Sequence, residues 1–254
     1  MAGITHRLWI DWDRNGVYTD ESSRLVSASG QMRLAAPEES IMSPRGIMAQ
    51  MTIELGNGDN RFSALKTTGA LYADIAGGGY YQCPMYFEVS IDSGSNYYRL
   101  LVGYIKGPVE NAIKFDGPAT VSFDCRSREE LIINKRVSTL QSVFVSIHDN
   151  GATESEVIAQ WLQDAGLSSG DYTLDHGLFN IEWAWLDDES PIEDAWALAA
   201  ACGGRFYCDP DGEFVYENMA HWLTSPHNTS QETLAKGDYN NLRLRYEDGE
   251  LYKT

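Results

Sequence analysis

Short stretches in which apolar and polar residues alternate dominate the first half of the chain. A period of two is typical of a β-strand with one buried face. Turn residues, Ser93-Gly94-Ser95-Asn96, separate two of these stretches. We therefore expect antiparallel β-structure over residues 1–137, arranged as a barrel or a sandwich. The predicted strands are Leu8–Asp13, Arg24–Ala28, Met48–Leu55, Met85–Ile91, Tyr97–Lys106 and Ala119–Cys125.

One segment of this β-rich half, Asn57–Tyr80, does not alternate and ends in three glycines, Gly77-Gly78-Gly79, followed by Tyr80. Its length is unusual for a connection inside a compact domain. Long loops of this kind often carry contacts or function. We therefore expect the segment to make a specific contact.

Later in the chain, apolar residues recur at helical spacing. Ser127 with Glu130, and Thr153 with Glu156, each predict a capping box at the start of a helix. The second of these helices is expected to end at Gly166.

The stretch Leu186–Asn218 predicts a third helix that leads into a β-hairpin. Ser190, Pro191 and Glu193 supply an N-cap, a first-turn proline and a capping-box glutamate. Gly203 follows the last helical position and is expected to end the helix. The two alternating stretches of the hairpin are Arg205–Cys208 and Glu213–Glu217, joined by Asp209-Pro210-Asp211-Gly212.

These elements predict a mainly β chain with an α+β insert. The expected domains are a β-barrel over residues 1–137 and a small α+β domain of two helices and a hairpin over residues 138–225. Residues 226–254 contain one further predicted strand, Asn240–Tyr246. That strand would either return to the first domain or begin a second barrel.

The composition is that of a globular protein, with 43% hydrophobic and 22% charged residues among 254. The beginning of the chain does not resemble a secretory signal, and no apolar run approaches the roughly 20 residues of a membrane span. Four cysteines are too few for a disulfide scaffold, so we expect reduced thiols.

Acidic residues outnumber basic ones, 37 to 19, which leaves a net charge of −18. Such a surface repels nucleic acid, so DNA binding is not expected. The charge is consistent with ordinary solubility, or with a surface that stays near DNA without binding it.

One loop resembles the front of a calcium site. Carboxylate and amide oxygens occur at its positions 1, 3 and 5, a glycine at position 6 and a backbone carbonyl at position 7. The alternative is a hairpin tip in which Asp and Asn bond their own backbone, because Ser22 stands where the bidentate glutamate is expected and the flanks predict strands. The candidate ligands are Asp11, Asp13, Asn15, Val17 and Asp20.

No further constellation predicts chemistry. Cys202, Cys208, His221 and His227 have a spacing that only partly matches a zinc finger, because the first gap is too long. The acidic run Asp187-Asp188-Glu189 precedes a helix N-terminus, where the helix dipole favours negative charge. We therefore expect no catalytic residues, no enzyme activity, and no cofactor other than possible calcium.

Three ordered motifs resemble the N-terminal part of phage tail-tip hub proteins, the baseplate hub or minor tail proteins. DWDRNGVYTDESSRLVSASG is similar to the common start of the family, and GNGDNRFSAL followed by GALY is similar to its NxDGRFSPL…SPLY segment. The stretch from Leu186 to Asn218 is similar to a helix and hairpin of the family. The resemblance covers most of the chain, with Asn60 in place of the usual glycine before Arg61.

The resemblance implies a structural virion component with a tube-like β-barrel domain. Proteins of this family form a trimeric ring that joins the tail tube to the spike or fibre, and DNA passes through the ring during genome ejection. The implied partners are other copies of the chain, a distal tail protein, the spike or fibre proteins and the tape-measure protein, with no membrane. The implied location is the phage tail tip, after synthesis in the host cytoplasm.

The long segment is then a candidate surface for subunit or partner contacts. It offers one charge, Arg61, and three large apolar side chains, Phe62, Leu71 and Tyr72. Phe62 and Leu71 could equally fold back on their own barrel. The alternative functions are a distal tail protein, which shares the barrel but forms hexamers, and a calcium-dependent carbohydrate-binding tail module.

Overall fold

The computed structural model describes residues 4–33, 47–63, 66–75, 79–110, 119–138 and 152–229. The chain divides into two compact units, Met1–Met219 and Ala220–Thr254. The domain boundaries expected at residues 137 and 225 stay predictions, and the predicted strand Asn240–Tyr246 lies outside the described residues.

In the described part of the first unit, the alternating stretches form a seven-stranded antiparallel sheet. Its strand order is β2-β1-β5-β6-β7-β4-β3. The predicted strands are confirmed, with boundaries shifted by a few residues. The strands are β1 (Thr5–Ile10), β2 (Thr19–Asp20), β3 (Leu25–Arg33), β4 (Ile47–Gly56), β5 (Cys83–Ser90), β6 (Tyr98–Glu110) and β7 (Thr120–Ser127).

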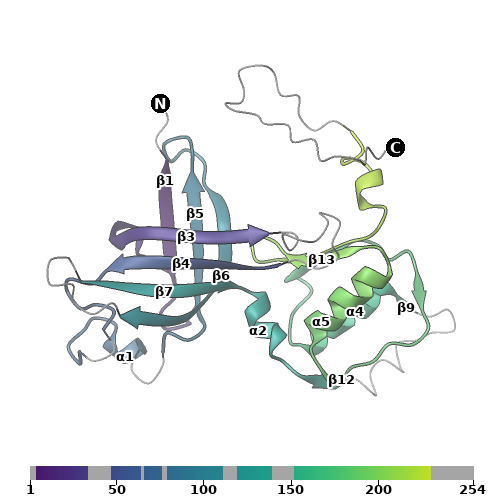
Figure 1. Ribbon diagram of the computed structural model, residues 1–254, viewed down its shortest axis with the longest axis horizontal. Coiled ribbons are helices and arrows are strands. Elements are labelled where there is room, and N and C mark those ends of the chain that lie inside the picture. Colours follow the sequence, from purple (N-terminus) through teal and green to yellow (C-terminus); the bar gives the residue numbers. More distant parts are fainter. Residues whose placement is uncertain are drawn as a thin grey trace, which may run out of the picture. The chain divides into compact units, whose positions relative to one another are not determined.

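The sheet turns a corner at β6, the longest strand. The first half of β6 pairs with β5, and its second half pairs with β7 across a register shift between Ile105 and Gly107. A bulge of this kind bends a strand and increases its twist. Figure 1 shows the result, with β3, β4 and β7 running across the direction of β1 and β5.

Bending brings the apolar faces of the two halves together, as in orthogonal sheet packing. The enclosed core is rich in fully buried large side chains, which in this part of the chain include Phe62, Phe123, Leu8, Ile53 and Met85. Within the described residues, β2 and β3 remain the two edges of the sheet. The antiparallel β-fold is therefore confirmed, and the observed pairing is that of an open, bent sheet.

The α+β part has its own core, built around two amphipathic helices that contact each other. Both helices end in a Schellman motif with a glycine at positive φ. Gly166 and Gly203 have φ of 90° and 68°. The amide of the following residue donates to the carbonyl five residues earlier in both cases. The helices are α4 (Glu154–Asp164) and α5 (Pro191–Ala201).

The expected hairpin is confirmed as β13 (Arg205–Cys208) and β14 (Phe214–Glu217), with Gly212 at positive φ in its turn. A third strand, β10 (Tyr172–Leu174), adds to β14 in parallel. The remaining elements of the unit are short and lie at its connections. These are η1 (Ser22–Arg24), α1 (Tyr72–Ile75), α2 (Glu129–Ile133), β8 (Val137–Ser138), β9 (Ala152–Thr153), β11 (Asn180–Ile181) and β12 (Asp187–Glu189).

Of the three predicted capping boxes, the one at Thr153 and Glu156 forms. The box predicted at Ser127 is wrong, because α2 begins one residue later and the Ser127 hydroxyl donates to the buried carboxylate of Glu129. Ser190 does occupy the N-cap position of α5, but its hydroxyl donates to the carbonyl of Ile133 (3.1 Å). A different local partner thus replaced the predicted cap at Ser127, and a tertiary partner replaced it at Ser190.

In the second unit, the structure describes residues 220–229. They contain the short helix η2 (His221–Leu223), and the rings of His221 and His227 lie 4.3 Å apart. No helix in the described parts of the chain is long and apolar enough to cross a membrane.

Candidate functional site

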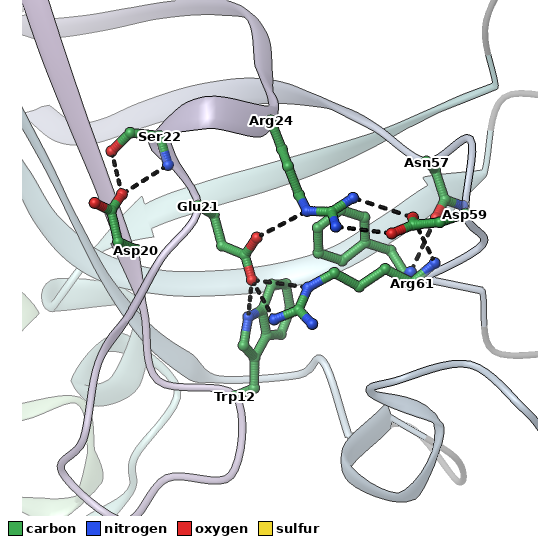
Figure 2. A network of polar contacts seen from close by, with 9 residues as sticks. Trp12, Asp20, Glu21, Ser22, Arg24, Asn57, Asp59 and Arg61 are labelled. Atoms are coloured by element: carbon green, nitrogen blue, oxygen red, sulfur yellow. Dashed lines mark hydrogen bonds and ion pairs between the residues drawn. The ribbon is translucent and has the colours of Figure 1, made fainter.

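The first two resemblance motifs meet at one buried carboxylate, that of Glu21, which is 2% exposed. Glu21 lies just before η1, where the chain turns from β2 into β3. The indole N–H of Trp12 donates to its Oε1 (3.1 Å), as Figure 2 shows. The Trp12 ring packs in turn against Phe62, with ring centroids 5.5 Å apart, and against Phe123 at 5.7 Å. The carboxylate therefore sits at the rim of the sheet core.

Two guanidinium groups balance the charge of Glu21. Arg61 donates to Oε1 through Nε (3.1 Å) and Nη2 (2.7 Å). Arg24 lies on the other side, with its Nε 3.5 Å from Oε2. A buried carboxylate needs partners of this kind, because the loss of hydration must be offset by charge and hydrogen bonds.

Arg24 also binds Asp59 through two parallel hydrogen bonds (3.0 and 2.7 Å). The hydrogen bond from Arg24 holds the pKa of the Asp59 carboxyl below its usual range, and it raises the pKa of the Arg24 guanidinium. The same carboxylate accepts the backbone N–H of Arg61 (3.2 Å). Arg24 thus connects the beginning of β3 to the loop that follows β4.

The backbone of that loop is fixed by Asn57 and Asn60. The side-chain oxygen of Asn57 accepts the N–H of Phe62 (2.9 Å), and its own N–H donates to the Ala119 carbonyl (2.7 Å). Asn60 has a φ of 59°, in the left-handed region that asparagine tolerates better than most residues. This explains how Asn60 can stand where the resemblance leads one to expect glycine.

We call these side chains the Glu21 network: Trp12, Glu21, Arg24, Asn57, Asp59 and Arg61. It joins the first motif to the second and fixes both against the sheet. Its polar groups form hydrogen bonds and ion pairs with one another, which indicates a structural role. Arg61 was predicted from the sequence as a contact residue, but Glu21 was not predicted as its partner. An alternating pattern does not show which carboxylate is buried.

The four residues proposed for partner contacts differ in their accessibility. Phe62 is fully buried and Leu71 is 7% exposed, and both belong to the core of the sheet. Arg61 binds Glu21, with 20% of its side chain exposed. Tyr72, at the start of α1, is half-buried and does not belong to the core of the sheet.

In the candidate calcium loop, the oxygens accept hydrogen bonds from the loop itself. Asp11, 2% exposed, accepts the backbone N–H groups of Asn15 (3.2 Å) and Gly16 (2.8 Å). Asp13 accepts the Asn15 amide (2.7 Å), and the Asn15 oxygen accepts the N–H of Val17 (2.7 Å). Asp20 accepts the N–H and hydroxyl of Ser22. This is the bonding expected of the hairpin-tip alternative, and calcium binding stays a prediction.

The cysteines in the zinc-like spacing are buried and unpaired with one another. Cys208 packs in the core of the α+β part, and burial raises the pKa of its thiol well above the usual value. Burial also raises the pKa of the Cys202 thiol. Zinc binds the thiolate, so both environments disfavour it. Within the described residues, no group of three or more His, Cys, Asp or Glu side chains is placed to hold a metal ion.

A second surface follows from the register of β3, β4 and β7. Gln31, Gln50 and Arg126 lie side by side in one row, and Ser29, Thr52 and Asp124 in the next. Cross-strand hydrogen bonds run along this face, from Thr52 to Asp124 (3.0 Å) and from Arg126 to Gln50. A depression of about 390 Å³ lies over these rows. We call it the polar sheet face: Ser27, Ser29, Gln31, Gln50, Thr52, Glu54, Ser122, Asp124 and Arg126.

No family model matches the chain, and no curated protein matches it either. Among solved structures, it resembles the 43 kDa tail protein of prophage MuSo2 from Shewanella oneidensis, with 13% identity and a TM-score of 0.49 over 85% of this chain and 54% of that one. It also resembles a tail protein from Neisseria meningitidis MC58, with 13% identity and a TM-score of 0.48 over 84% and 50% of the two chains.

A third similar structure is an Escherichia coli component of the type VI secretion system, described as structurally similar to bacteriophage T4 tail proteins. It matches with 12% identity and a TM-score of 0.42, over 85% of this chain and 45% of that one. The chain thus spans about half the length of the structures it matches.

Proposed function

We propose that the chain is a structural component of a phage tail tip, the front part of a hub that forms a ring between tail tube and spike. The observation that carries this proposal is the Glu21 network. Residues of both motifs that give the chain its resemblance to hub proteins, Asp11–Gly30 and Gly56–Leu65, converge on one buried carboxylate, that of Glu21. The residues of the two motifs therefore stabilise the fold together. This is the role expected of motifs in a family of structural proteins.

The polar sheet face supports the second part of the proposal, a lumen through which DNA passes. Its rows consist of uncharged polar side chains with a few acids and one arginine. Phosphate binding depends on clustered lysine and arginine, so a face of this composition offers DNA little to bind. Together with the net charge of −18, it would let DNA slide past.

In this proposal the chain is not an enzyme. Its partners are two further copies in a trimer, a distal tail protein above, and spike, fibre and tape-measure proteins, and its location is the virion. The acids of the first motif have structural roles, Asp11 in its own turn and Glu21 in the network. The alternative of a calcium-dependent carbohydrate-binding module is less well supported, because the Asp11 oxygens already accept backbone N–H groups.

The test is the mass and symmetry of the purified chain, by analytical ultracentrifugation and negative-stain microscopy. We expect three copies in a ring. Six copies would instead support a distal tail protein, and a chain that stays monomeric at high concentration would contradict the ring.

Tyr72→Ser tests the large apolar member of the contact segment that lies outside the sheet core, because removal of an aromatic anchor weakens an interface. Tyr98→Ser is the matched control, since Tyr98 is 58% exposed at the start of β6. We expect the ring to dissociate at a higher concentration in the first variant than in the second. Equal dissociation would remove Tyr72 from the interface.

A further inference from the structure

The charges of the chain are distributed unevenly. Between Arg136 and Arg205 the sequence contains twelve Asp or Glu residues and no Lys or Arg. All 19 basic residues of the protein therefore lie outside this stretch, which contributes most of the α+β part. The stretch itself therefore contributes only negative charge to the field at the surface of this part, and the neighbouring Arg128 and Arg205 are already paired with Asp171 and Glu217.

Within this stretch, residues 178–189 form what we call the acidic aromatic surface. Leu178 is 49% exposed, Phe179 42%, Trp183 60% and Trp185 52%. The same segment presents four exposed acids, Glu182, Asp187, Asp188 and Glu189. Single exposed apolar residues are common on protein surfaces, but two tryptophans and a phenylalanine within seven residues are not.

The backbone of this segment is held in place, so the exposure is built into the fold. The N–H groups of Leu178 and Phe179 both donate to the carboxylate of Glu154 (2.8 Å each), which is fully buried at the start of α4. β11 then pairs with β9, and β12 pairs with β8.

Between these two pairings the side chains alternate. Leu186 is fully buried and Ala184 packs against the core of the α+β part, while Trp183 and Trp185 have more than half of their surface exposed. An extended chain directs alternate side chains to opposite sides, so the inward packing of Ala184 and Leu186 turns both indole rings outward.

Exposed aromatic side chains next to acidic ones favour a partner that offers both apolar contacts and positive charge. Tryptophan and tyrosine are enriched at the centres of interfaces, and complementary charge guides the encounter. A second copy of the chain does not supply that charge, since the protein is net acidic. Nucleic acid is excluded for the same reason. Lysine and arginine satisfy both features, because they pair with carboxylates and also stack on aromatic faces.

We propose that the acidic aromatic surface docks a protein segment in which Lys or Arg alternates with large apolar side chains. The chain already uses this chemistry internally, where Arg7 lies 3.7 Å from the ring centroid of Tyr97. The surface is separate from the Glu21 network and from the polar sheet face, so the proposal goes beyond ring formation and does not depend on it.

The probe is a dye-labelled twelve-residue peptide of alternating Arg and Leu, titrated with the full chain and followed by fluorescence anisotropy. Two peptides serve as references, one with Glu in place of Arg and one with Ser in place of Leu. We expect the Arg/Leu peptide to bind at least tenfold more tightly than either reference. Its affinity should fall severalfold when the salt concentration rises from 0.15 M to 1 M, because the Debye length shrinks from about 8 to 3 Å.

Two variants locate the site. Trp183→Ser combined with Trp185→Ser should weaken binding about tenfold or more, as the loss of interface anchors does. Asp187→Asn with Asp188→Asn and Glu189→Gln should remove most of the salt dependence; Asp188 has a φ of 57°, which asparagine tolerates. Val26→Ser with Ile91→Ser is the matched control, because both side chains are more than half exposed elsewhere.

Circular dichroism and thermal unfolding first establish that each variant is folded. Unchanged peptide affinity in the folded tryptophan variant would overturn the proposal. So would tryptophan-dependent binding of neutral oligosaccharides on a glycan array without peptide binding, or a chain dimer that the tryptophan variant breaks. The peptide and glycan readouts are independent of ring formation, because they are compared between variants of the same oligomeric mass.

Discussion

Glu21 gives up the hydration of a charged carboxylate, and three donors offset that cost. Trp12, Arg24 and Arg61 all approach its two oxygens, within 3.5 Å. Breaking such a network is more costly than removing a surface pair, since the remaining charges stay where water reaches them poorly.

We therefore expect Glu21→Gln to lower the free energy of unfolding by about 3 kcal/mol, measured by urea denaturation. Glu88→Gln is the matched control, because Glu88 pairs with an arginine that is 44% exposed, and should cost less than about 1 kcal/mol. Similar losses in the two variants would show that the Glu21 network contributes no more than a surface ion pair.

At Asn60 the backbone conformation decides which residues are tolerated. Its φ of 59° is left-handed, a conformation that costs a residue with a Cβ roughly 1–2 kcal/mol, and more when that residue is β-branched. Asn60→Gly should keep or slightly raise the stability, whereas Asn60→Val should lower it by about 2 kcal/mol. Chemical denaturation of the two variants side by side checks this, and equal stability would mean that the turn relaxes without cost.

Among the elements, β6 decides how the sheet bends. At Gly103 the backbone approaches β7 so closely that a Cβ atom would lie 1.9 Å from the Arg126 carbonyl oxygen. At Gly107, in the same strand, a Cβ would meet no atom within 4 Å. The two glycines therefore form a natural pair for comparison.

Gly103→Ala should destabilise the fold by about 3 kcal/mol or more, because the clash is with backbone and cannot be relieved by a side-chain rotation. Gly107→Ala should stay within about 1 kcal/mol of the parent chain. The measurement is thermal unfolding followed by circular dichroism. A Gly103 variant as stable as the Gly107 variant would mean that the close approach of β6 to β7 is not required.

The loop before β10 is tied to α2 by a charged contact whose strength depends on pH. Asp171 accepts the hydroxyl and N–H of Ser168 (2.6 and 2.8 Å) and Nη2 of Arg128 (2.7 Å). The hydrogen bond from the Ser168 hydroxyl, followed by that from Arg128, lowers the pKa of Asp171 to about 2. The unfolded value is near 3.9, so the folded state holds this proton more weakly.

The contribution of the Asp171 carboxylate to the free energy of unfolding should therefore be complete above about pH 5 and be lost as the pH falls toward 2. We expect Asp171→Asn to be less stable than the parent chain by roughly 1–2 kcal/mol at pH 7, and the difference to shrink at pH 3. Urea denaturation at both values tests this. A difference that is independent of pH would assign the effect to the shape of the loop instead of its charge.

On the scale of the whole molecule, the compact unit Met1–Met219 contains both described hydrophobic cores. A chain that ends at Met219 should therefore keep the thermal midpoint of the parent to within a few degrees. A chain that ends at Cys208 is the control and should lose cooperative unfolding, because it lacks β14, the middle strand of its sheet. A chain ending at Met219 that fails to fold would show that residues 220–254 are needed for stability.

The sequence alone determined which segments become the long strands and helices, because that information is local, whereas the short elements β2, α1 and β10 were not predicted. Alternation predicted the strands, and glycines at positive φ ended the two long helices where spacing and composition placed them. It also determined the antiparallel β class and the helix–hairpin unit, since both depend on neighbouring residues along the chain.

Contacts between distant segments were decided only by the tertiary structure. Glu21 and Arg61 are 40 residues apart, and the Ser190 hydroxyl donates to the carbonyl of Ile133, 57 residues away, instead of capping its own helix. Phe62 and Leu71, equally suited by type to an interface or a core, became core because the bent sheet encloses them. Burial and charge pairing depend on which surfaces the fold brings together, and a pattern with a period of two or 3.6 residues carries no information about that.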